Sequence, residues 1–209
     1  MGKRLLLIGG GGHCHSVLDS VLSLNKYEGV GIIDSIDSPY LDIPVIGIDE
    51  DIPELFSEGW TDAFITVGSV GSTDIRRRLY KMVKEIGLSV PSIIDPTAMI
   101  GRGVTIGEGS FVGKRAVVNA GSSVGTCAII NTGAIVEHDC NVGDFSHISP
   151  GTVLCGQVSI GNDSHVGAGS TVKQLIEIGE NSLIGAGSIV VKDIPSNVKA
   201  FGNPCKVVV

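Results

Sequence analysis

The fold is decided by the stretch 130–154, INTGAIVEHDCNVGDFSHISPGTVL, in which an aliphatic residue returns at every sixth position. Outward from this stretch the same period runs without a slip from Ile94 to Val190. The residue four places after each aliphatic residue is usually small. The residue directly after it is often Gly or Asn, types that tolerate a left-handed backbone. A period of six excludes a continuous amphipathic helix. It predicts a hexapeptide β-helix, in which three strand-and-turn units form a coil and residues eighteen apart stack.

Residues 1–90 follow a different pattern. Residues 4–8, 29–33 and 63–67 are apolar runs typical of strands, whereas 15–27 and 72–86 have helical spacing, with Gly87 as a stop. Alternating strands and helices predict a small Rossmann-like α/β domain with a parallel sheet. We therefore expect two domains, 1–90 and 91–209, joined near 89–96, with a C-terminal tail closing the second.

Composition excludes several classes of protein. The net charge of -7 gives no basic face for nucleic acid. No apolar run approaches the ~20 residues of a membrane span, and the run 5–8 is too short for a secretory signal. Five cysteines without a CxxC pair favour reduced thiols. We expect a cytoplasmic protein without membrane insertion.

One corner of the predicted β-helix carries Glu137, His138 and Asp139 side by side. Stepping by eighteen places Gly156 next to His138, and Lys173 and Lys192 on later coils. His147 precedes an inward residue, so it points outward from the flat face opposite this corner. Within one chain the two imidazoles are then on the order of 10–15 Å apart. They meet only if a neighbouring β-helix joins the site, which predicts a homotrimer with three equivalent clefts.

This corner suits acyl transfer from a long thioester. His138 is the expected general base, and Asp139 or Glu137 is expected to orient it. The Gly156 N–H is placed to stabilise an oxyanion, and Lys173 and Lys192 to contact phosphate. An acylated pantetheine on a nucleotide has the required shape, and no metal is expected. The bland alternative is a solvated corner with surface lysines; we expect His165, one coil beyond His147, to lie on the surface.

The segment 8–16, IGGGGHCHS, follows a predicted strand and opens a predicted helix. Gly9, Gly10, Gly11 and Gly12 are therefore candidates for binding a nucleotide phosphate at the helix N-terminus, although a tight structural turn is the alternative. The dinucleotide fingerprint fails at Cys14, and about ninety residues is small for a redox domain, so we expect no dinucleotide cofactor. Asp34, at the end of the second strand, is a candidate ribose or base contact.

The sequence resembles a bacterial family of sugar acetyltransferases. The family includes sialic-acid O-acetyltransferases, N-acetyltransferases of UDP-4-amino-sugars in bacillosamine synthesis, and enzymes of the perosamine type. The resemblance rests on GGGGH near the start, on NTGAIVEHDCNVGDFSHISPG, on 154–156 and on the closing GNPCK. It implies a left-handed parallel β-helix, a homotrimer, acetyl-CoA bound between β-helices, and a nucleotide-sugar bound by the N-terminal domain.

The resemblance also implies roles for single residues. His138 matches the general base and Asp139 the neighbouring acid, Asn131 and His147 line the acetyl-CoA and acceptor site, and Gly156 holds the thioester carbonyl. The matches to nucleotide-sugar contacts are His13, Asp34 and Gly68. Ser35 and Ser69 stand where a relative carries an acid and an Asn, which leaves the sugar and base open; Cys205 replaces an Ala.

We therefore expect an acetyl-CoA-dependent acyltransferase that N-acetylates a nucleotide-linked, UDP-type 4-amino-dideoxysugar by direct transfer. The alternative within the class is O-acetylation of sialic acid or another sugar hydroxyl. Two other classes are a zinc hydratase, which needs three convergent histidines, and a non-catalytic nucleotide-sugar-binding scaffold.

Overall fold

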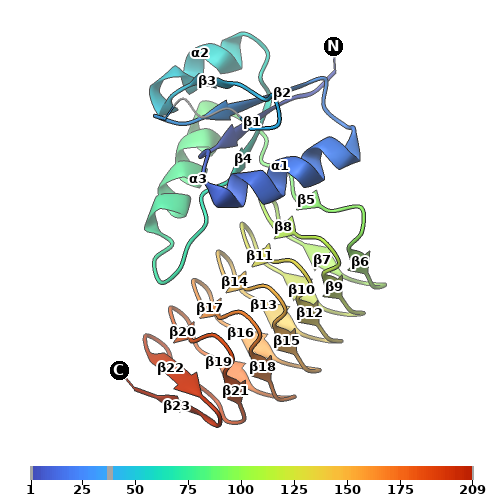
Figure 1. Ribbon diagram of the computed structural model, residues 1–209, viewed down its shortest axis with the longest axis vertical. Coiled ribbons are helices and arrows are strands. Elements are labelled where there is room, and N and C mark those ends of the chain that lie inside the picture. Colours follow the sequence, from blue (N-terminus) through green and yellow to red (C-terminus); the bar gives the residue numbers. More distant parts are fainter. Residues whose placement is uncertain (1, 37–39, 209) are drawn as a thin grey trace.

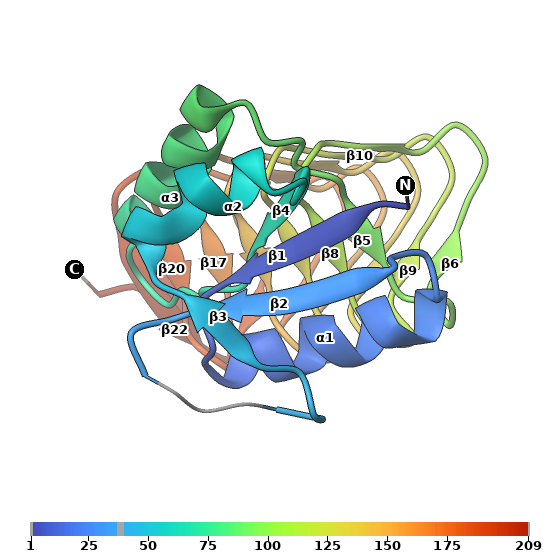
Figure 2. The ribbon, with the colours of Figure 1, turned by 90° about the horizontal axis from the view of Figure 1, so that it is seen from above.

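The N-terminal domain is a parallel sheet with helices on both faces. The computed structural model describes residues 2–36 and 40–208. The sheet has the order β3-β2-β1-β4. Helix α1 lies on one face, and α2 and α3 on the other (Figures 1 and 2). The elements are β1 (Arg4–Ile8), α1 (Gly12–Leu24), β2 (Gly29–Ile33), β3 (Val45–Gly47), a 3-10 helix (Asp49–Asp51), α2 (Ile52–Ser57), β4 (Asp62–Ile65) and α3 (Asp74–Ile86).

The predicted strands and helices of this domain are present. The helix predicted over 72–86 ends as expected, with Gly87 in the left-handed region at φ 104°. The helix predicted over 15–27 begins earlier, at Gly12, and ends at Leu24. Strand β3 and helix α2 were not predicted, because three and six residues are too few for a periodic pattern to stand out.

The C-terminal domain is a left-handed parallel β-helix with three sheets, which confirms the predicted fold class (Figure 1). The polar sheet contains β7 (Thr105–Ile106), β10 (Ser123–Val124), β13 (Asn141–Val142), β16 (Ser159–Ile160) and β19 (Glu177–Ile178). The apolar sheet contains β6 (Met99–Ile100), β9 (Val117–Val118), β12 (Ile135–Val136), β15 (Val153–Leu154), β18 (Thr171–Val172) and β21 (Ile189–Val190). The docked sheet contains β5 (Ile93–Ile94), β8 (Phe111–Val112), β11 (Ile129–Ile130), β14 (His147–Ile148), β17 (His165–Val166), β20 (Leu183–Ile184), β22 (Lys199–Gly202) and β23 (Cys205–Val207).

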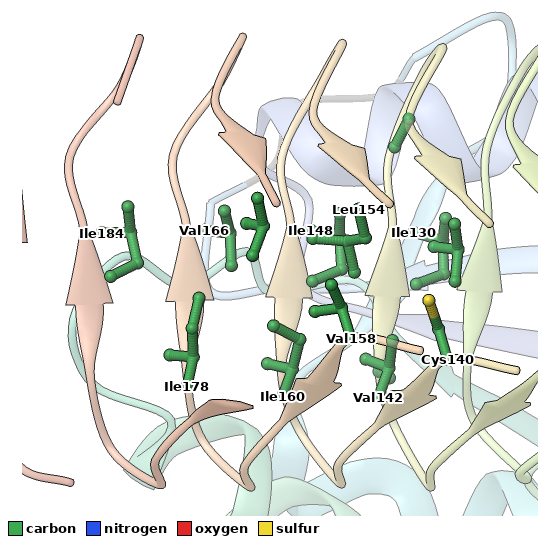
Figure 3. Packing of buried hydrophobic residues seen from close by; sticks show 14 of the residues in the cluster. Ile130, Cys140, Val142, Ile148, Leu154, Val158, Ile160, Val166, Ile178 and Ile184 are labelled. Atoms are coloured by element: carbon green, nitrogen blue, oxygen red, sulfur yellow. The ribbon is translucent and has the colours of Figure 1, made fainter. Parts of the chain in front are cut away.

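In each two-residue strand of the β-helix, the side chain of the second residue points inward and that of the first points outward. The inward aliphatic residues stack along the axis and are buried, as Val142, Ile148 and Ile160 illustrate (Figure 3). Small inward residues fill the rest of each layer, and their hydroxyls bond to the next coil; Ser146, for example, donates to the Gly161 carbonyl at 2.7 Å. Adjacent coils pair in a register of eighteen residues, such as Ile135 with Val153. The six-residue period therefore builds the core directly.

The glycines that directly follow the inward aliphatic residues serve a purpose that differs from the expected one. The left-handed residue is the third after each inward aliphatic residue, for example Asp139 at φ 58° after Val136. The glycine directly after the aliphatic residue instead approaches the next coil: a Cβ on Gly143 would stand 2.6 Å from the Asn162 amide nitrogen. Close stacking of coils, and not backbone handedness, thus excludes a side chain there.

The outward residues give the three sheets different partners. On the docked sheet Ile93, Phe111 and Ile129 are buried in one cluster with β1 and α1. The polar sheet presents Thr105, Ser123, Asn141, Ser159 and Glu177. The apolar sheet presents Met99, Val117, Ile135, Val153, Thr171 and Ile189, and none of its five apolar side chains belongs to a core cluster of the described residues.

The column ends in a shortened coil. Beyond Val190 the register drops from eighteen to sixteen residues, so that Leu183 pairs with Lys199. The chain then turns back, and β23 pairs antiparallel with β22. Among residues 2–36 and 40–208, none of the helices combines the length and apolar character needed to cross a bilayer.

Candidate active site

His138 lies in the turn that follows strand β12 of the apolar sheet. Its side chain is 58% exposed, and its Nδ1 lies 2.9 Å from Oδ2 of Asp139. If Nδ1 carries the proton for this contact, Nε2 holds the lone pair and is free to accept a proton. Asp139 occupies a left-handed position, a conformation that Asp tolerates better than most residues.

Glu137 does not contact the imidazole of His138. Its Oε2 accepts a hydrogen bond from Nδ2 of Asn119 at 3.1 Å, one coil back, and lies 3.3 Å from the backbone N of His138. The sequence left open which carboxylate orients the ring. In the structure Asp139 touches the ring, whereas Glu137 holds the backbone of the turn.

Gly156 lies against the other edge of the His138 ring, as the eighteen-residue step predicts. A Cβ on Gly156 would stand 2.5 Å from Nε2 of His138. The neighbouring amides of Cys155 and Gln157 donate to Val172 and His138 carbonyls, whereas the Gly156 N–H bonds to no carbonyl of the described residues. The corner thus offers a base and a free amide donor without a side chain between them.

A cavity of about 430 Å³ lies where the N-terminal domain meets the docked sheet. We call it the acceptor cavity. The N-terminal domain contributes the start of α1 and the loop after β4, and the β-helix contributes turns of successive coils. Its lining residues are Gly12, His13, Ser16, Gly68, Ser69, Val70, Asn131, Thr132, His147 and Pro150. The structure therefore joins predicted nucleotide-sugar residues with predicted acceptor-site residues, although they lie far apart in the sequence.

Both ring nitrogens of His147 are engaged in this cavity. Nδ1 lies 3.2 Å from the Ser69 carbonyl and Nε2 lies 3.1 Å from Nδ2 of Asn131. The carbonyl can only accept, so Nδ1 donates and Nε2 accepts from the Asn131 amide. Burial, followed by the neighbouring His165, lowers the pKa of His147 to about 3. His147 is thus a neutral imidazole held in one tautomer.

His13 and His165 flank His147. Burial, and then the charge of Arg76, lowers the pKa of His13 to about 4. Nε2 of His13 is buried without a hydrogen-bond partner among the described residues. His165, which was expected to lie on the surface, is half-buried: it packs edge-to-face against His147 at 4.9 Å, and its Nε2 lies 3.2 Å from the Ser149 hydroxyl. The N-terminal domain covers this part of the docked sheet, and burial lowers the pKa of His165.

The four glycines 9–12, which lead into α1, divide into two pairs. Gly9 has φ 107°, and the Gly10 N–H donates to Oδ2 of Asp34 at 2.6 Å, so these two shape the loop. A Cβ on Gly11 or Gly12 would meet nothing within 4 Å. The second pair therefore leaves open space at the helix N-terminus, where an anion is favoured.

Asp34 organises this loop through both carboxylate oxygens. Oδ2 accepts from Gly10 and Oδ1 accepts from the Ile36 N–H at 3.0 Å. The hydrogen bond from Gly10 is the main reason why the pKa of Asp34 is lowered. Asp34 also lines a second cavity of about 350 Å³, together with Ser35, Asp49 and Arg78. This cavity lies beside the glycine loop, at the carboxyl ends of β1 and β2, where parallel sheets bind ligands.

Comparison with known families matches both halves of the chain. The model of the PglD N-terminal domain matches residues 4–83. The model of the bacterial transferase hexapeptide matches residues 139–174. The model of the hexapeptide repeat of succinyl-transferase matches residues 103–137 and 157–192. Comparison with curated proteins gave no match.

Solved structures match the whole chain. The acetyltransferase domain of PglB from Neisseria gonorrhoeae, also solved with acetyl coenzyme A, is 34% identical with a TM-score of 0.93, and the match covers 99% of this chain and 100% of that one. PerB from Caulobacter crescentus, solved with CoA and GDP-perosamine, is 35% identical with a TM-score of 0.93, over 99% and 98% of the two chains. This chain belongs to the bacterial hexapeptide-repeat sugar acetyltransferases. Its membership confirms the resemblance and the acyltransferase class. WeeI from Acinetobacter baumannii, at 22% identity and a TM-score of 0.87, shares the fold.

Within the single chain of this sugar acetyltransferase the candidate residues form two groups. The corner group, Glu137, His138, Asp139 and Gly156, follows strands of the apolar sheet. Lys173 and Lys192 lie on later coils along the same corner and are exposed. The acceptor cavity opens on the docked sheet and is not lined by His138. This separation is the one expected from the eighteen-residue step.

Sequence analysis missed several residues that line the acceptor cavity of this sugar acetyltransferase. Ser16, Val70, Thr132 and Pro150 carry no pattern of their own and reach the cavity only because the domains dock. A signal for that docking was nevertheless present. The outward residues Ile93, Phe111 and Ile129, taken at eighteen-residue steps, form an apolar ladder that a solvated sheet does not carry.

Proposed function

We propose that this enzyme transfers the acetyl group of acetyl-CoA to the amino group of a nucleotide-linked 4-amino-dideoxysugar, at a site shared by two subunits. The observation that carries the proposal is the contact of Nε2 of His138 with the side-chain-free Gly156, with Asp139 on the opposite edge of the ring. A base, its orienting acid and an amide donor are thereby held at one corner. A nucleotide-sugar fits the acceptor cavity, the open glycine pair and the second cavity beside Asp34.

His138 acts as the general base in this mechanism. Nε2 takes the proton from the amine as it attacks the thioester carbonyl, and Asp139 stabilises the resulting imidazolium. The Gly156 N–H donates to the oxyanion that develops on that carbonyl. When the oxyanion collapses, the C–S bond breaks, and the proton held by His138 can be passed to the departing CoA sulfur. Lys173 and Lys192 contact the phosphates of the coenzyme.

A homotrimer completes the site in this proposal. The apolar sheet presents Met99, Val117, Ile135, Val153 and Ile189, which a neighbouring subunit can cover. His138 follows β12 of this same sheet, so a subunit packed on it lies next to the catalytic corner. That subunit supplies its acceptor cavity to His138, as the separation of the two groups within one chain requires.

Similarity favours acyl transfer over zinc hydration, because the acetyltransferase domain of PglB and PerB match the whole chain. A catalytic zinc site needs three protein ligands around one ion. Within one chain His147 and His165 adjoin, but His138 follows a strand of a different sheet. In the described part of the chain no group of three His, Cys, Asp or Glu residues is placed to share a metal ion.

The test is an assay of acetyl transfer by the purified enzyme to a panel of acceptors, in which the release of the free CoA thiol is measured. UDP-linked 4-amino-dideoxysugars are the expected substrates, and GDP-linked ones are the matched alternative, because PerB was solved with GDP-perosamine. The corresponding 4-hydroxy sugars and free sialic acid serve as controls. Faster transfer to the hydroxyl acceptors, or binding of acetyl-CoA without any transfer, would contradict the proposal.

A further inference from the structure

The acceptor cavity is lined from both domains, so its shape depends on how the N-terminal domain is held on the β-helix. Gly68 and Ser69 come from the loop between β4 and α3, whereas Asn131 and His147 come from the β-helix. On the α1 side the two domains share an apolar cluster. On the α3 side Tyr80 and Lys84 bond to Glu108 of the β-helix. Two consecutive arginines, Arg76 and Arg77, also contact the β-helix, and they do so in different ways.

Arg77 forms an ordinary ion pair at the surface. Its Nε and one terminal nitrogen each lie 2.7 Å from an oxygen of Asp163, and its side chain is 43% exposed. Such a pair adds a modest amount to stability and does not reach the acceptor cavity. Arg77 therefore serves as the reference for its neighbour.

Arg76 is only 3% exposed. Its guanidinium donates to the carbonyls of Cys127 and Phe145, the latter at 3.0 Å. These two residues are eighteen apart, and both have a positive φ, so the fork of Arg76 spans equivalent turns of adjacent coils. Within residues 2–36 and 40–208 no carboxylate forms an ion pair with Arg76, and burial lowers its pKa to about 10. An apolar side chain of similar size is often at least as stabilising as a buried charge, so stability alone does not explain an arginine here.

A third partner connects Arg76 to the site. One terminal nitrogen lies 3.3 Å from the Ser69 hydroxyl. The Ser69 carbonyl accepts the hydrogen bond from Nδ1 of His147, and Nε2 of His147 accepts from Asn131. A continuous line of contacts therefore runs from the buried guanidinium, through the β4–α3 loop, to the side chains that line the acceptor cavity.

We propose, on the basis of the proposed function, that Arg76 is a positioning residue for the acceptor. By joining Ser69 to two adjacent coils, it fixes the loop that seats the sugar relative to His147 and Asn131. Of the predicted coenzyme contacts, Gly156, Lys173 and Lys192 lie along another corner, whereas Asn131 and His147 were expected to serve both acetyl-CoA and the acceptor. Loss of Arg76 therefore weakens the use of the acceptor much more than the use of acetyl-CoA.

The test compares Arg76→Met, Arg76→Lys and Arg77→Met in the full-length enzyme, with kcat and both KM values measured for each. For Arg76→Met we expect kcat/KM for the acceptor to fall about 10- to 100-fold while KM for acetyl-CoA stays within about 2-fold. Lysine keeps a charge but not the planar fork, so Arg76→Lys is expected to recover only part of this loss. Arg77→Met is expected to lower Tm without changing either KM.

Several results would overturn the role of Arg76. Unchanged kcat/KM for the acceptor in folded Arg76→Met is one, and an equal rise of both KM values is another. If Arg76→Met does not fold, the double variant Ser69→Ala/Arg76→Lys is compared with its two single variants. If Arg76 acts through Ser69, kcat/KM of the double variant for the acceptor should be no lower than that of the more impaired single variant. Additive losses in kcat/KM would contradict this role. Failure of the wild-type enzyme to acetylate any aminosugar contradicts the proposed function as well, while normal wild-type transfer with unaffected variants contradicts the Arg76 role alone.

Discussion

Nε2 of His138 lies 2.5 Å from the position that a Cβ on Gly156 would occupy, so the imidazole and the next coil are in direct contact. Gly156 is not among the residues with positive φ, and alanine can therefore adopt its backbone conformation. The three atoms nearest to such a methyl group all belong to the His138 ring. The lack of a side chain at Gly156 therefore helps to determine the orientation of the His138 ring.

Gly156→Ala is therefore expected to displace the His138 ring and lower kcat by about 10²-fold, with little change in Tm. The measurement is steady-state kinetics alongside thermal unfolding. Because both substitutions remove the same placed base, Gly156→Ala in a His138→Ala background should cause little further loss. A full second loss in the double variant would show that the two residues act independently.

The two carboxylates of the corner should respond differently to neutralisation. Asp139→Asn keeps a residue that tolerates φ 58° but removes the charged partner of the ring, and we expect kcat to fall about 10- to 100-fold. Glu137→Gln is the matched control, since Glu137 bonds Asn119 and the turn backbone. It should retain nearly full kcat. The reverse order of effects would assign the orienting role to Glu137.

The proposed contact between subunits can be tested at the apolar sheet. Ile135→Lys places a charge on the face proposed to meet a neighbouring subunit, and it should convert the proposed trimer to monomers with loss of activity. Asn141→Lys, on the polar sheet, is the control and should leave both properties intact. Light scattering after gel filtration gives the mass. An active Ile135→Lys monomer would contradict a shared site.

Mixing inactive variants tests whether the active site is shared between two subunits, through the activity that the mixture regains. His138→Ala alone should lose about 10²–10⁴-fold in kcat with the trimer intact. His147→Ala should impair the acceptor cavity of its own subunit. Co-refolded equimolar mixtures should regain about a quarter of the wild-type sites, because each site takes one corner and one cavity from different chains. A mixture no more active than its parents would place both groups in one subunit.

Stability should fall as the solution becomes moderately acidic. His13, His147 and His165 have pKa values lowered by burial, to about 4 and about 3 for the first two. Between about pH 6.5 and pH 4 the unfolded chain binds protons at His13 and His147 that the folded protein does not, so folding loses up to about 1.4 kcal/mol per pH unit for each of these two histidines, and His165 contributes in the same direction.

Urea unfolding between pH 7.5 and 4.5 measures this dependence. His147→Gln should reduce the slope of the unfolding free energy against pH, because one buried imidazole is removed. A free energy of unfolding that stays constant from pH 7 to pH 5 would contradict neutral burial of these rings.

The β-helix could be predicted because its signal repeats. The inward positions from Ile94 to Val190 share the same environment, and the eighteen-residue step therefore predicts from the sequence alone that Gly156 lies beside His138, as the structure shows. The choice between Asp139 and Glu137 could not be made in this way, because it depends on side-chain rotamers. The burial of His165 could not either, because it depends on where the loop after β4 settles on the docked sheet.

The outward residues held information that the inward repeat obscured. Taken at eighteen-residue steps, they separate an apolar ladder beginning Ile93 and Phe111, a second beginning Met99 and Val117, and a polar ladder beginning Thr105 and Ser123. Among residues 2–36 and 40–208, only the first ladder has outward residues in a buried core cluster. The outward residues of a repeat, considered one sheet at a time, thus indicate which faces of the β-helix are covered by another domain or chain.

The constant register of the coils also makes the β-helix a molecular ruler. Each coil advances the column by about 4.8 Å, so the steps from His138 to Lys192 span roughly 14 Å. In the proposed mechanism this length separates the reacting carbonyl from the phosphates of the coenzyme. Deleting one coil between them would leave a β-helix that can still fold but in which the distance from His138 to Lys192 no longer matches the length of the coenzyme. The number of repeats is therefore itself part of the enzyme's specificity.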